Sequence, residues 1–303
     1  MSPGVLRLAE ARFLGPARQK DFRYFLRTQV GEISRDENVD RLVKLCFSRN
    51  HVPGLDGALW KWVGIGVCDE PALHDEIARR IKESNRSLGA IARIIIKELT
   101  RFSGCSRACV KFPVNVRYIS ELMNWFPDGK VVHITRDPRA LAMSKSNDPS
   151  GTGPRVQRHP YLAWPIRKAA LAVVVSNYRL SAKMHRRFQG NANYRLFRYE
   201  DLLAEPEKTL RELCRFIETE FLEEMLEPQK GEHEHQPSSL TGKQQRAFDA
   251  EAAVRWQRVI SPFDRQLVTL STGPSMKQLG YDPATHPVFR PKGVVSESRL
   301  ISQ

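Results

Sequence analysis

The sequence predicts an α/β protein in which helices flank a central parallel sheet. Three short runs rich in β-branched and aromatic residues, at 108–112, 130–135 and 194–199, each precede a helical pattern. Strands that alternate with helices in this way pair in parallel, because each crossover returns the chain to the same edge of the sheet. Hydrophobic residues make up 41% of the 303 residues, which suffices for the core of such a sheet.

The first hundred residues contain helical patterns but no clear strand. Residues 1–33 fit no single pattern. A capping-box sequence at residues 34–37 precedes apolar residues at helical spacing up to Cys46. The glycine-rich stretch at residues 53–66 predicts a loop, and residues 71–99 contain two further helical patterns.

From residue 107 onwards, strand and helix patterns alternate along the chain. Pro113 stops the first strand, and the turn Asp128-Gly129 precedes the second. The PSGTGP sequence at residues 149–154 predicts a flexible loop. Helices are expected at residues 116–126, 139–146, 165–189, 206–218, 246–258 and 263–278.

The net charge and the lengths of the apolar stretches limit which partners and which cellular environments are expected for this chain. The net charge of +14 at pH 7 favours anionic partners, namely nucleic acids, acidic glycans or phosphate-rich cofactors, without choosing among them. We expect no nucleic-acid partner, because zinc-finger spacing and an RNP-like aromatic strand are missing from the sequence. The longest apolar stretch, residues 169–175, is far shorter than the ~20 residues that span a bilayer. We therefore expect a soluble chain with no membrane span and no targeting signal.

The cysteine and histidine patterns predict no metal. The five cysteines form no CxxC pair, and a structural zinc site needs four ligands in paired short spacings. Buried free thiols are the preferred interpretation and one disulfide is the alternative, with the roles of Cys105 and Cys109 left open. The His233-Glu234-His235 sequence lies in a polar stretch with no further ligand nearby, which is typical of a solvated loop.

The strand expected at residues 130–135 ends at the edge of the sheet where proteins of this fold class bind ligands. Parallel sheets bind ligands at the carboxyl ends of their strands, and this strand delivers Arg136 to that edge. Asp137 can cap the next helix and Pro138 suits its first position, so the positive end of the helix faces the same edge. Arg136 offers a planar guanidinium and Ser144 a hydroxyl, which predicts an anion site with phosphate as the preferred ligand. The alternative is an arginine that binds a structural carboxylate and a serine on an ordinary helix.

Three segments resemble sulfotransferases that use 3′-phosphoadenosine-5′-phosphosulfate (PAPS), closest to the carbohydrate (Golgi-type) branch. The sequence KVVHITRDPRALAMSKS, residues 130–146, resembles the family's 3′-phosphate-binding segment. The sequence FRYEDLLAEPEKTLRELCRFI, residues 197–217, resembles its RYEDL strand and helix. The stretch from Arg255 to Tyr281 resembles its C-terminal helices. The three segments keep the family's order, so the resemblance is specific.

The resemblance implies the P-loop-NTPase-like sulfotransferase fold. It is clear over residues 107–283, whereas residues 1–106 diverge. We expect a single domain over residues 1–283 and an irregular tail over residues 284–303.

The resemblance also implies donor-binding residues. Arg136 and Ser144 would bind the 3′-phosphate of PAPS, and Tyr199 would lie near the nucleotide. Lys111 ends a strand where the family places a lysine, so it would face the sulfate or a phosphate; the alternative is a surface lysine.

Three further residues are expected to have structural roles. Glu200 and Asp201 would cap and fix the helix that follows them. His133 is expected to point into the sheet, with a catalytic role as the alternative.

The family's second cradle, a GxxRSGTT-type loop for the 5′-phosphosulfate, has no recognisable counterpart. In the nearest stretch, Gly15 and Arg18 align with the motif, but Gln19, Lys20 and Asp21 replace its Ser-Gly-Thr part. This change gives up close backbone approach and places a carboxylate beside the anion. Three explanations remain: a truncated chain, a diverged loop in which Lys20 or Arg18 acts as a point charge, or lost catalysis with retained nucleotide binding.

The function that the resemblance implies is sulfuryl transfer from PAPS, without a metal, to a hydroxyl or amine of a carbohydrate-like acceptor. The basic surface is compatible with an anionic glycan. The catalytic base is not identified, because the sequence diverges after the 5′ loop. The alternative is a catalytically inactive relative that binds PAP or PAPS. If an N-terminal anchor is missing from the chain, the branch implies the Golgi lumen.

Overall fold

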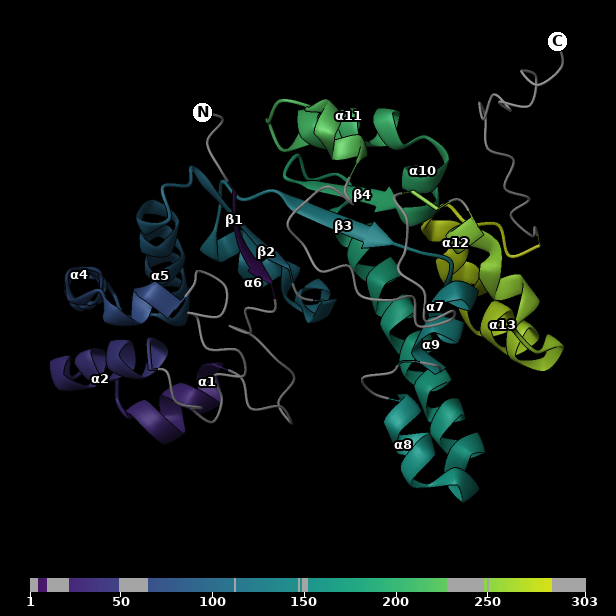
Figure 1. Cartoon of the computed structure of the whole chain (residues 1–303), viewed down its shortest axis with the longest axis horizontal. Helices are drawn as coiled ribbons and strands as arrows, with labels where there is room; N and C mark the ends of the chain where they lie inside the picture. The colour runs from purple at the N-terminus through teal and green to yellow at the C-terminus, as the bar shows by residue number, and fades with distance from the viewer. Residues whose placement is uncertain are drawn as a thin grey trace, which may run out of the picture. The chain divides into compact units, whose positions relative to one another are not determined.

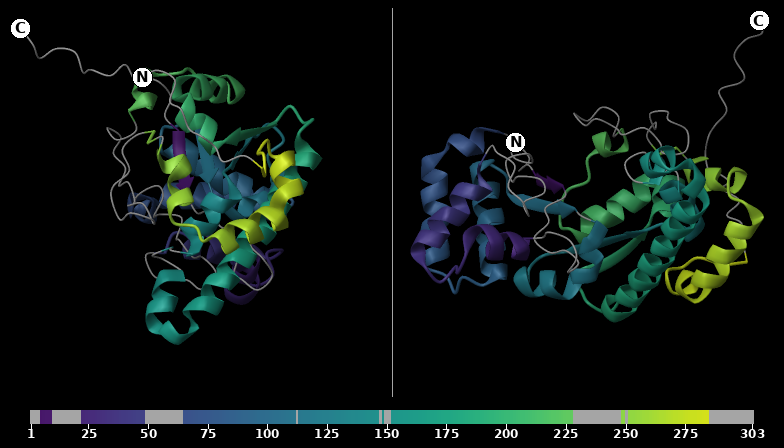
Figure 2. Two further views of the ribbon diagram at one scale, coloured as in Figure 1. Left: turned by 90° about the vertical axis from the view of Figure 1, so that its right-hand side faces the viewer. Right: turned by 90° about the horizontal axis from the view of Figure 1, so that it is seen from below.

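The structure, a computed structural model, divides into two compact units, residues 1–129 and 130–303, each with its own two-stranded parallel sheet (Figures 1 and 2). The single domain over residues 1–283 stays a prediction. The expected tail lies outside the described residues, apart from Ala284. The structure describes residues 5–9, 22–48, 65–111, 113–146, 148, 152–227, 248–249 and 251–284.

In the first unit, β1 (Val5–Ala9) pairs in parallel with β2 (Arg107–Lys111). The sequence predicted β2 within one residue but missed β1. Helices of three kinds accompany this sheet. The α-helices are α1 (Phe22–Phe25), α2 (Asp36–Cys46), α4 (Pro71–Lys82), α5 (Leu88–Phe102) and α6 (Ile119–Trp125). The others are the π-helix η1 (Leu26–Val30) and the 3₁₀-helices η2 (Ile65–Asp69) and η3 (Pro113–Tyr118).

The core of the first unit is mainly helical. Helices α2, α4 and α5 each bury apolar residues three or four positions apart, as expected for amphipathic helices. Gly89 lets α5 and α6 approach closely, because a Cβ there would lie 2.5 Å from the Trp125 ring. The predicted capping box is wrong in detail: Arg35 occupies the N-cap position of α2, and no side chain caps it. The fully buried residues of these helices include Val39, Leu42, Cys46, Ile77, Ile81, Ile91 and Leu99.

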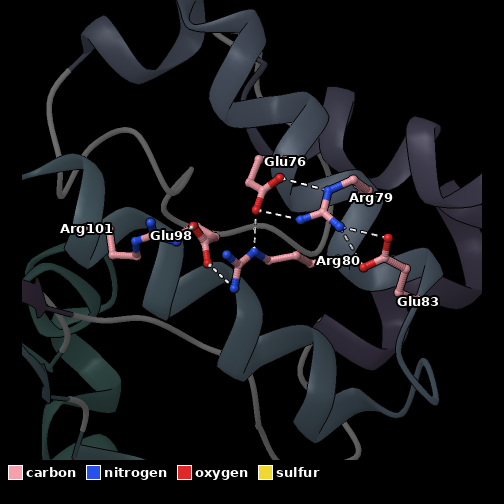
Figure 3. A network of polar contacts seen from close by, with 6 residues as sticks. All are labelled: Glu76, Arg79, Arg80, Glu83, Glu98 and Arg101. Carbon is pink, nitrogen blue, oxygen red and sulfur yellow. Dashed lines mark hydrogen bonds and ion pairs between the residues drawn. The ribbon is translucent and has the colours of Figure 1, made fainter.

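A charged network ties α4 to α5 (Figure 3). Glu98 is buried on α5, and its carboxylate oxygens lie 3.1 Å from Arg80 Nη1 and 3.3 Å from Arg101 Nη1. Hydrogen bonds from Arg79 and then Arg80 lower the pKa of Glu76 to about 2. Each arginine of the network therefore has a carboxylate partner. The members are Glu76, Arg79, Arg80, Glu83, Glu98 and Arg101.

In the second unit, β3 (Val131–Thr135) and β4 (Tyr194–Arg198) run side by side in the same direction (Figure 1). Both strands and the parallel pairing confirm the prediction. The helical elements in chain order are α7 (Pro138–Ser146), α8 (Thr152–Arg158), η4 (Pro160–Leu162), α9 (Ala163–Phe188), α10 (Tyr199–Ala204), α11 (Pro206–Phe216), η5 (Glu223–Leu226), α12 (Glu251–Val254), η7 (Arg255–Arg258) and α13 (Pro262–Gln278).

The core of the second unit forms where α7, α9 and α13 meet. Small residues of α7, Ala140 and Ala142, bring its backbone close to Leu171 and Val174 of α9. Trp256 is completely buried in the same cluster. Packing against α9 and Trp256 therefore fixes the position of α7. The start of this helix lies next to the carboxyl end of β3, where the sequence predicts a ligand.

Two further expectations concern the cysteines and the membrane. All five cysteines are free thiols, with Cys46 and Cys214 buried and Cys109 exposed, so the alternative of one disulfide is wrong.

None of the described helices combines the length and the apolar character that crossing a bilayer requires.

Candidate functional site

The parallel strands β3 and β4 bring two predicted site residues together. Thr135 pairs with Arg198, so the next residues of the two strands, Arg136 and Tyr199, leave the sheet at the same edge. The guanidinium carbon of Arg136 lies 4.7 Å from the centroid of the Tyr199 ring. This cation–π contact orients a planar cation at the carboxyl end of the sheet, which is where such sheets bind ligands.

Arg136 keeps part of its hydrogen-bonding capacity. Its Nη2 donates to the carbonyl of Ala252 at 2.6 Å, whereas its buried Nε has no acceptor among the described residues. No carboxylate in the described part of the chain pairs with Arg136. Within that part, the structure therefore does not support the alternative in which this arginine binds a structural carboxylate. A buried donor without a partner fits a site that an anionic ligand completes.

The helix α7 begins as the sequence predicted. Its first residue is Pro138, and Asp137 Oδ1 accepts a hydrogen bond from the backbone N–H of Arg139 at 2.8 Å. The same carboxylate binds the Arg139 guanidinium, with Nη2 at 2.7 Å from Oδ2. Only 1% of Asp137 and 2% of Arg139 are exposed, and Arg139 lies 4.8 Å from the Trp256 ring. Arg139 is therefore a structural cation, which leaves Arg136 as the arginine of this edge that suits a ligand.

Glu200 links three segments around this helix start. Its Oε1 accepts the backbone N–H of Asp137 at 2.9 Å, and its Oε2 accepts the hydroxyl of Tyr281 at 2.6 Å. Burial raises the pKa of Glu200, and the two hydrogen bonds oppose that rise. Burial also raises the pKa of Tyr281, helped by the Glu200 charge. The expected capping role is wrong, because Glu200 and Asp201 lie in the first turn of α10, and neither α10 nor the following α11 has a side-chain cap. Glu200 instead connects the start of α7 to the segment that follows α13.

Asp201 has a local role near the same edge. Its carboxylate binds the guanidinium of Arg198, which also donates to the carbonyl of Gly280 and lies 5.4 Å from the Tyr281 ring. Gly280 has a φ of +79°, a conformation that glycine adopts without strain after a helix end. Asp201 therefore holds Arg198, and through it the segment after α13.

The other predicted residues are placed as follows. Ser144 is partly buried in α7, about 9 Å along the helix axis from Pro138 by the standard rise. Lys111 is exposed at the last position of β2, in the first unit. Arg18 lies outside the described residues, as does the whole stretch that aligned with the 5′-loop motif.

Metal ligation finds no support in the ranges that the structure describes, where no three His, Cys, Asp or Glu side chains are arranged to hold an ion. The His233-Glu234-His235 sequence falls outside those ranges.

His133 is buried in β3 as a structural side chain. Its Nδ1 lies 2.6 Å from the Tyr194 hydroxyl and its Nε2 lies 2.7 Å from the Ser181 hydroxyl of α9. Burial, and to a smaller degree the charge of His185, lowers the pKa of His133 to about 4. Both ring nitrogens are engaged, one with β4 and the other with α9, so the structural role expected of His133 fits its contacts.

The low pKa of His133 predicts acid-sensitive stability. The unfolded chain takes up this proton near pH 6.5, and the folded protein only near pH 4, so the contribution is complete above pH 6.5 and is lost as pH falls toward 4. Between pH 7 and pH 5 the loss amounts to about 2 kcal/mol. Urea unfolding at both pH values measures it. His133→Asn should show a loss smaller by about that amount, and His159→Gln, in a half-exposed position, should not. Equal losses in His133→Asn and the wild type would contradict the prediction.

Sequence reasoning missed the link between Glu200 and Tyr281. The two residues are 81 positions apart, and no spacing rule connects them. The only available signal was that both fall within segments of the family resemblance.

Residues 64–224, more than half of the chain, match the model of the sulfotransferase family, and this range includes Arg136, Ser144 and Tyr199. No curated protein sequence matches the chain.

Two solved structures share the fold. The sulfotransferase domain from the Synechococcus PCC 7002 olefin synthase has 17% identity and a TM-score of 0.50, over 93% of this chain and 96% of that one. The sulfotransferase domain from the curacin biosynthetic pathway has 15% identity and a TM-score of 0.51, over 92% of this chain and 98% of that one. At such identities the likeness shows the fold alone.

Proposed function

The chain belongs to the sulfotransferase family, and from this membership we propose that it transfers a sulfuryl group from PAPS to an acceptor hydroxyl. The observation that carries the donor assignment is Arg136, whose buried Nε has no acceptor among the described residues and whose guanidinium stacks on Tyr199. Phosphate oxygens are suitable acceptors for this donor.

In this proposal, Arg136 binds the 3′-phosphate and Ser144 adds a hydroxyl from α7. Tyr199 orients Arg136 and offers an aromatic surface next to the nucleotide. Asp137, Arg139 and Glu200 act indirectly, because their hydrogen bonds fix the start of α7. PAPS would supply the sulfuryl group: the acceptor oxygen would bond to sulfur and lose its proton, the bond from sulfur to the 5′-phosphate oxygen would break, and PAP would leave. The cationic edge and the helix N-terminus stabilise negative charge on the bound nucleotide.

For the acceptor we propose a hydroxyl, or an amine, of a carbohydrate-like molecule. Two observations support it: the RDPRA segment at residues 136–140, which resembles the carbohydrate branch, and the basic character of the chain. The two structural neighbours come from an olefin synthase and the curacin pathway, so small biosynthetic alcohols are the competing acceptors to test.

A second candidate is a catalytically inactive relative that binds PAP or PAPS. The observation that favours it is the presence of Gln19, Lys20 and Asp21 where the family's 5′ loop has Ser-Gly-Thr. A carboxylate at that place opposes the binding of the 5′-phosphosulfate.

One experiment separates these candidates. The purified chain is incubated with ³⁵S-labelled PAPS and a panel of glycans and small alcohols, and its melting temperature is measured with and without PAP. Transfer to an acceptor, together with stabilisation by PAP, supports the enzyme; at a PAP concentration of 100 times Kd the stabilisation is about 2.7 kcal/mol. Stabilisation without transfer supports the inactive relative. Neither transfer nor stabilisation would remove both.

A further inference from the structure

The positive charge of the chain is concentrated in one segment. Residues 149–199 contain ten arginines and lysines and no aspartate or glutamate. This segment therefore contributes +10 of the net charge of +14. Its described residues form mainly α8, η4, α9 and β4, and α9 alone spans 26 residues without a carboxylate.

Most of these cations are exposed and lack carboxylate partners. On α4 and α5, by contrast, each arginine of the charged network pairs with a glutamate. Among the ion pairs of the described residues, only Lys168, Arg195 and Arg198 of the segment have acidic partners. The exposed cations without one are Arg155, Arg158, Arg167, Arg179, Lys183, Arg186 and Arg187.

An apolar patch adjoins these cations. Its most exposed side chains, between 64% and 78% exposed, are Tyr161, Trp164, Phe263 and Leu270. Lys168 connects α9, which carries Trp164, to α13, which carries Phe263. Its Nζ lies 5.8 Å from the Trp164 ring centroid and 4.9 Å from the Phe263 ring centroid. We call the following set the aromatic patch: Tyr161, Leu162, Trp164, Phe263, Leu267 and Leu270.

The aromatic patch includes a face of α13 that the core does not use. Helix α13 packs beside α9 (Figures 1 and 2) and buries Val268 and Met276. Phe263, Leu267 and Leu270 recur at i, i+4 and i+7, which places them together on the opposite face. Helix α13 is therefore apolar on two opposite faces, and an exposed apolar patch of this kind is typical of an interaction surface.

We propose that this surface binds a bilayer containing anionic lipids, with the aromatic patch at the headgroup level and the surrounding cations against lipid phosphates. Charge complementarity supports this partner, because a second copy would bring two cationic surfaces together. The projecting side chains support it too: they insert into a fluid interface, whereas a protein partner would have to offer matching pockets. Tyr and Trp beside Leu and Phe, with arginines around them, is the composition of interfacial anchors.

The test is co-sedimentation of the chain with vesicles of phosphatidylcholine alone, or mixed with phosphatidylserine. Binding to the mixed vesicles that weakens with salt is expected, since juxtamembrane cations contribute about 1 kcal/mol each. The triple variant Trp164→Ala, Phe263→Ala and Leu270→Ala should bind about tenfold more weakly or worse, because it removes most of the apolar area that would enter the bilayer. The matched control, Phe102→Ala with Leu222→Ala, removes exposed apolar side chains elsewhere and should bind like the wild type.

The cations are tested separately. Arg158→Ala with Arg167→Ala should weaken binding about tenfold or more. Arg211→Ala with Lys208→Ala removes the same charge from α11, where both cations pair with glutamates, and should have a much smaller effect. Equal binding to both kinds of vesicle, no binding to either, or binding that the triple variant retains would overturn the proposal. So would patch-dependent self-association, or an acidic protein that binds the patch while anionic vesicles do not.

Discussion

Replacing Arg136 with alanine is expected to weaken PAP binding about 100-fold, because the 3′-phosphate loses a charge-assisted, bidentate partner worth about 3 kcal/mol. Arg136→Lys keeps the charge but not the planar fork, so its loss should be intermediate, about tenfold. Isothermal titration calorimetry with PAP measures both. The fold should survive, since the described structure shows one hydrogen bond from this guanidinium, to the carbonyl of Ala252.

Two controls make this result specific for the 3′-phosphate. Adenosine 5′-phosphate lacks that group, so Arg136→Ala should change its affinity far less than that of PAP. Arg195, on β4, is half-exposed and pairs with Glu212, so Arg195→Ala should leave PAP binding unchanged. If Arg136→Ala weakened both nucleotides equally, or neither, the 3′-phosphate would not lie at Arg136.

Asp137→Asn is expected to destabilise the protein by about 3–5 kcal/mol, because it leaves the Arg139 guanidinium buried without its carboxylate. Asparagine can still cap α7, so the variant isolates the charge from the cap. The loss is a large part of the 5–15 kcal/mol typical of a folded domain. Equilibrium urea unfolding, with the slope checked against the wild type, measures it.

The comparison that decides this prediction uses an exposed ion pair. Glu207→Gln breaks the exposed contact with Arg211 on α11 and should cost less than about 1 kcal/mol. The double variant Asp137→Asn with Arg139→Leu should recover part of the loss, because it removes the stranded charge. An Asp137→Asn variant within 1 kcal/mol of the wild type would show that the buried pair does not hold α7.

The strand β3 and the start of α7 could be predicted because the residues that form them carry clear local signals. The run from Val131 to Thr135 is dense in β-branched residues, and Asp137-Pro138 carries its own helix-start signal. The short strand Val5–Ala9 was missed, because it pairs with a strand about a hundred residues later and its own pattern is weak. Arg35 took the N-cap position that Ser34 was expected to fill, since helix ends shift easily by a residue.

The candidate site was predictable only in part. The meeting of Arg136 and Tyr199 follows from a general rule, because adjacent parallel strands end at one edge. Tertiary contacts such as that of Glu200 with Tyr281 follow no spacing rule and required the structure. The roles of Ser144, Lys111 and Arg18 stay predictions, as does the carbohydrate acceptor.

The bond between Glu200 and Tyr281 has a consequence for how the polypeptide tolerates shortening. A chain that stopped at the end of α13 would keep every helix that the structure describes in the second unit, yet the buried Glu200 carboxylate would lose its hydrogen bond from the Tyr281 hydroxyl. That carboxylate also receives the amide of Asp137, next door to Arg136. Removing Tyr281 would therefore change the contacts beside Arg136, at the edge proposed to bind the donor, so tags and deletions should be placed beyond Tyr281.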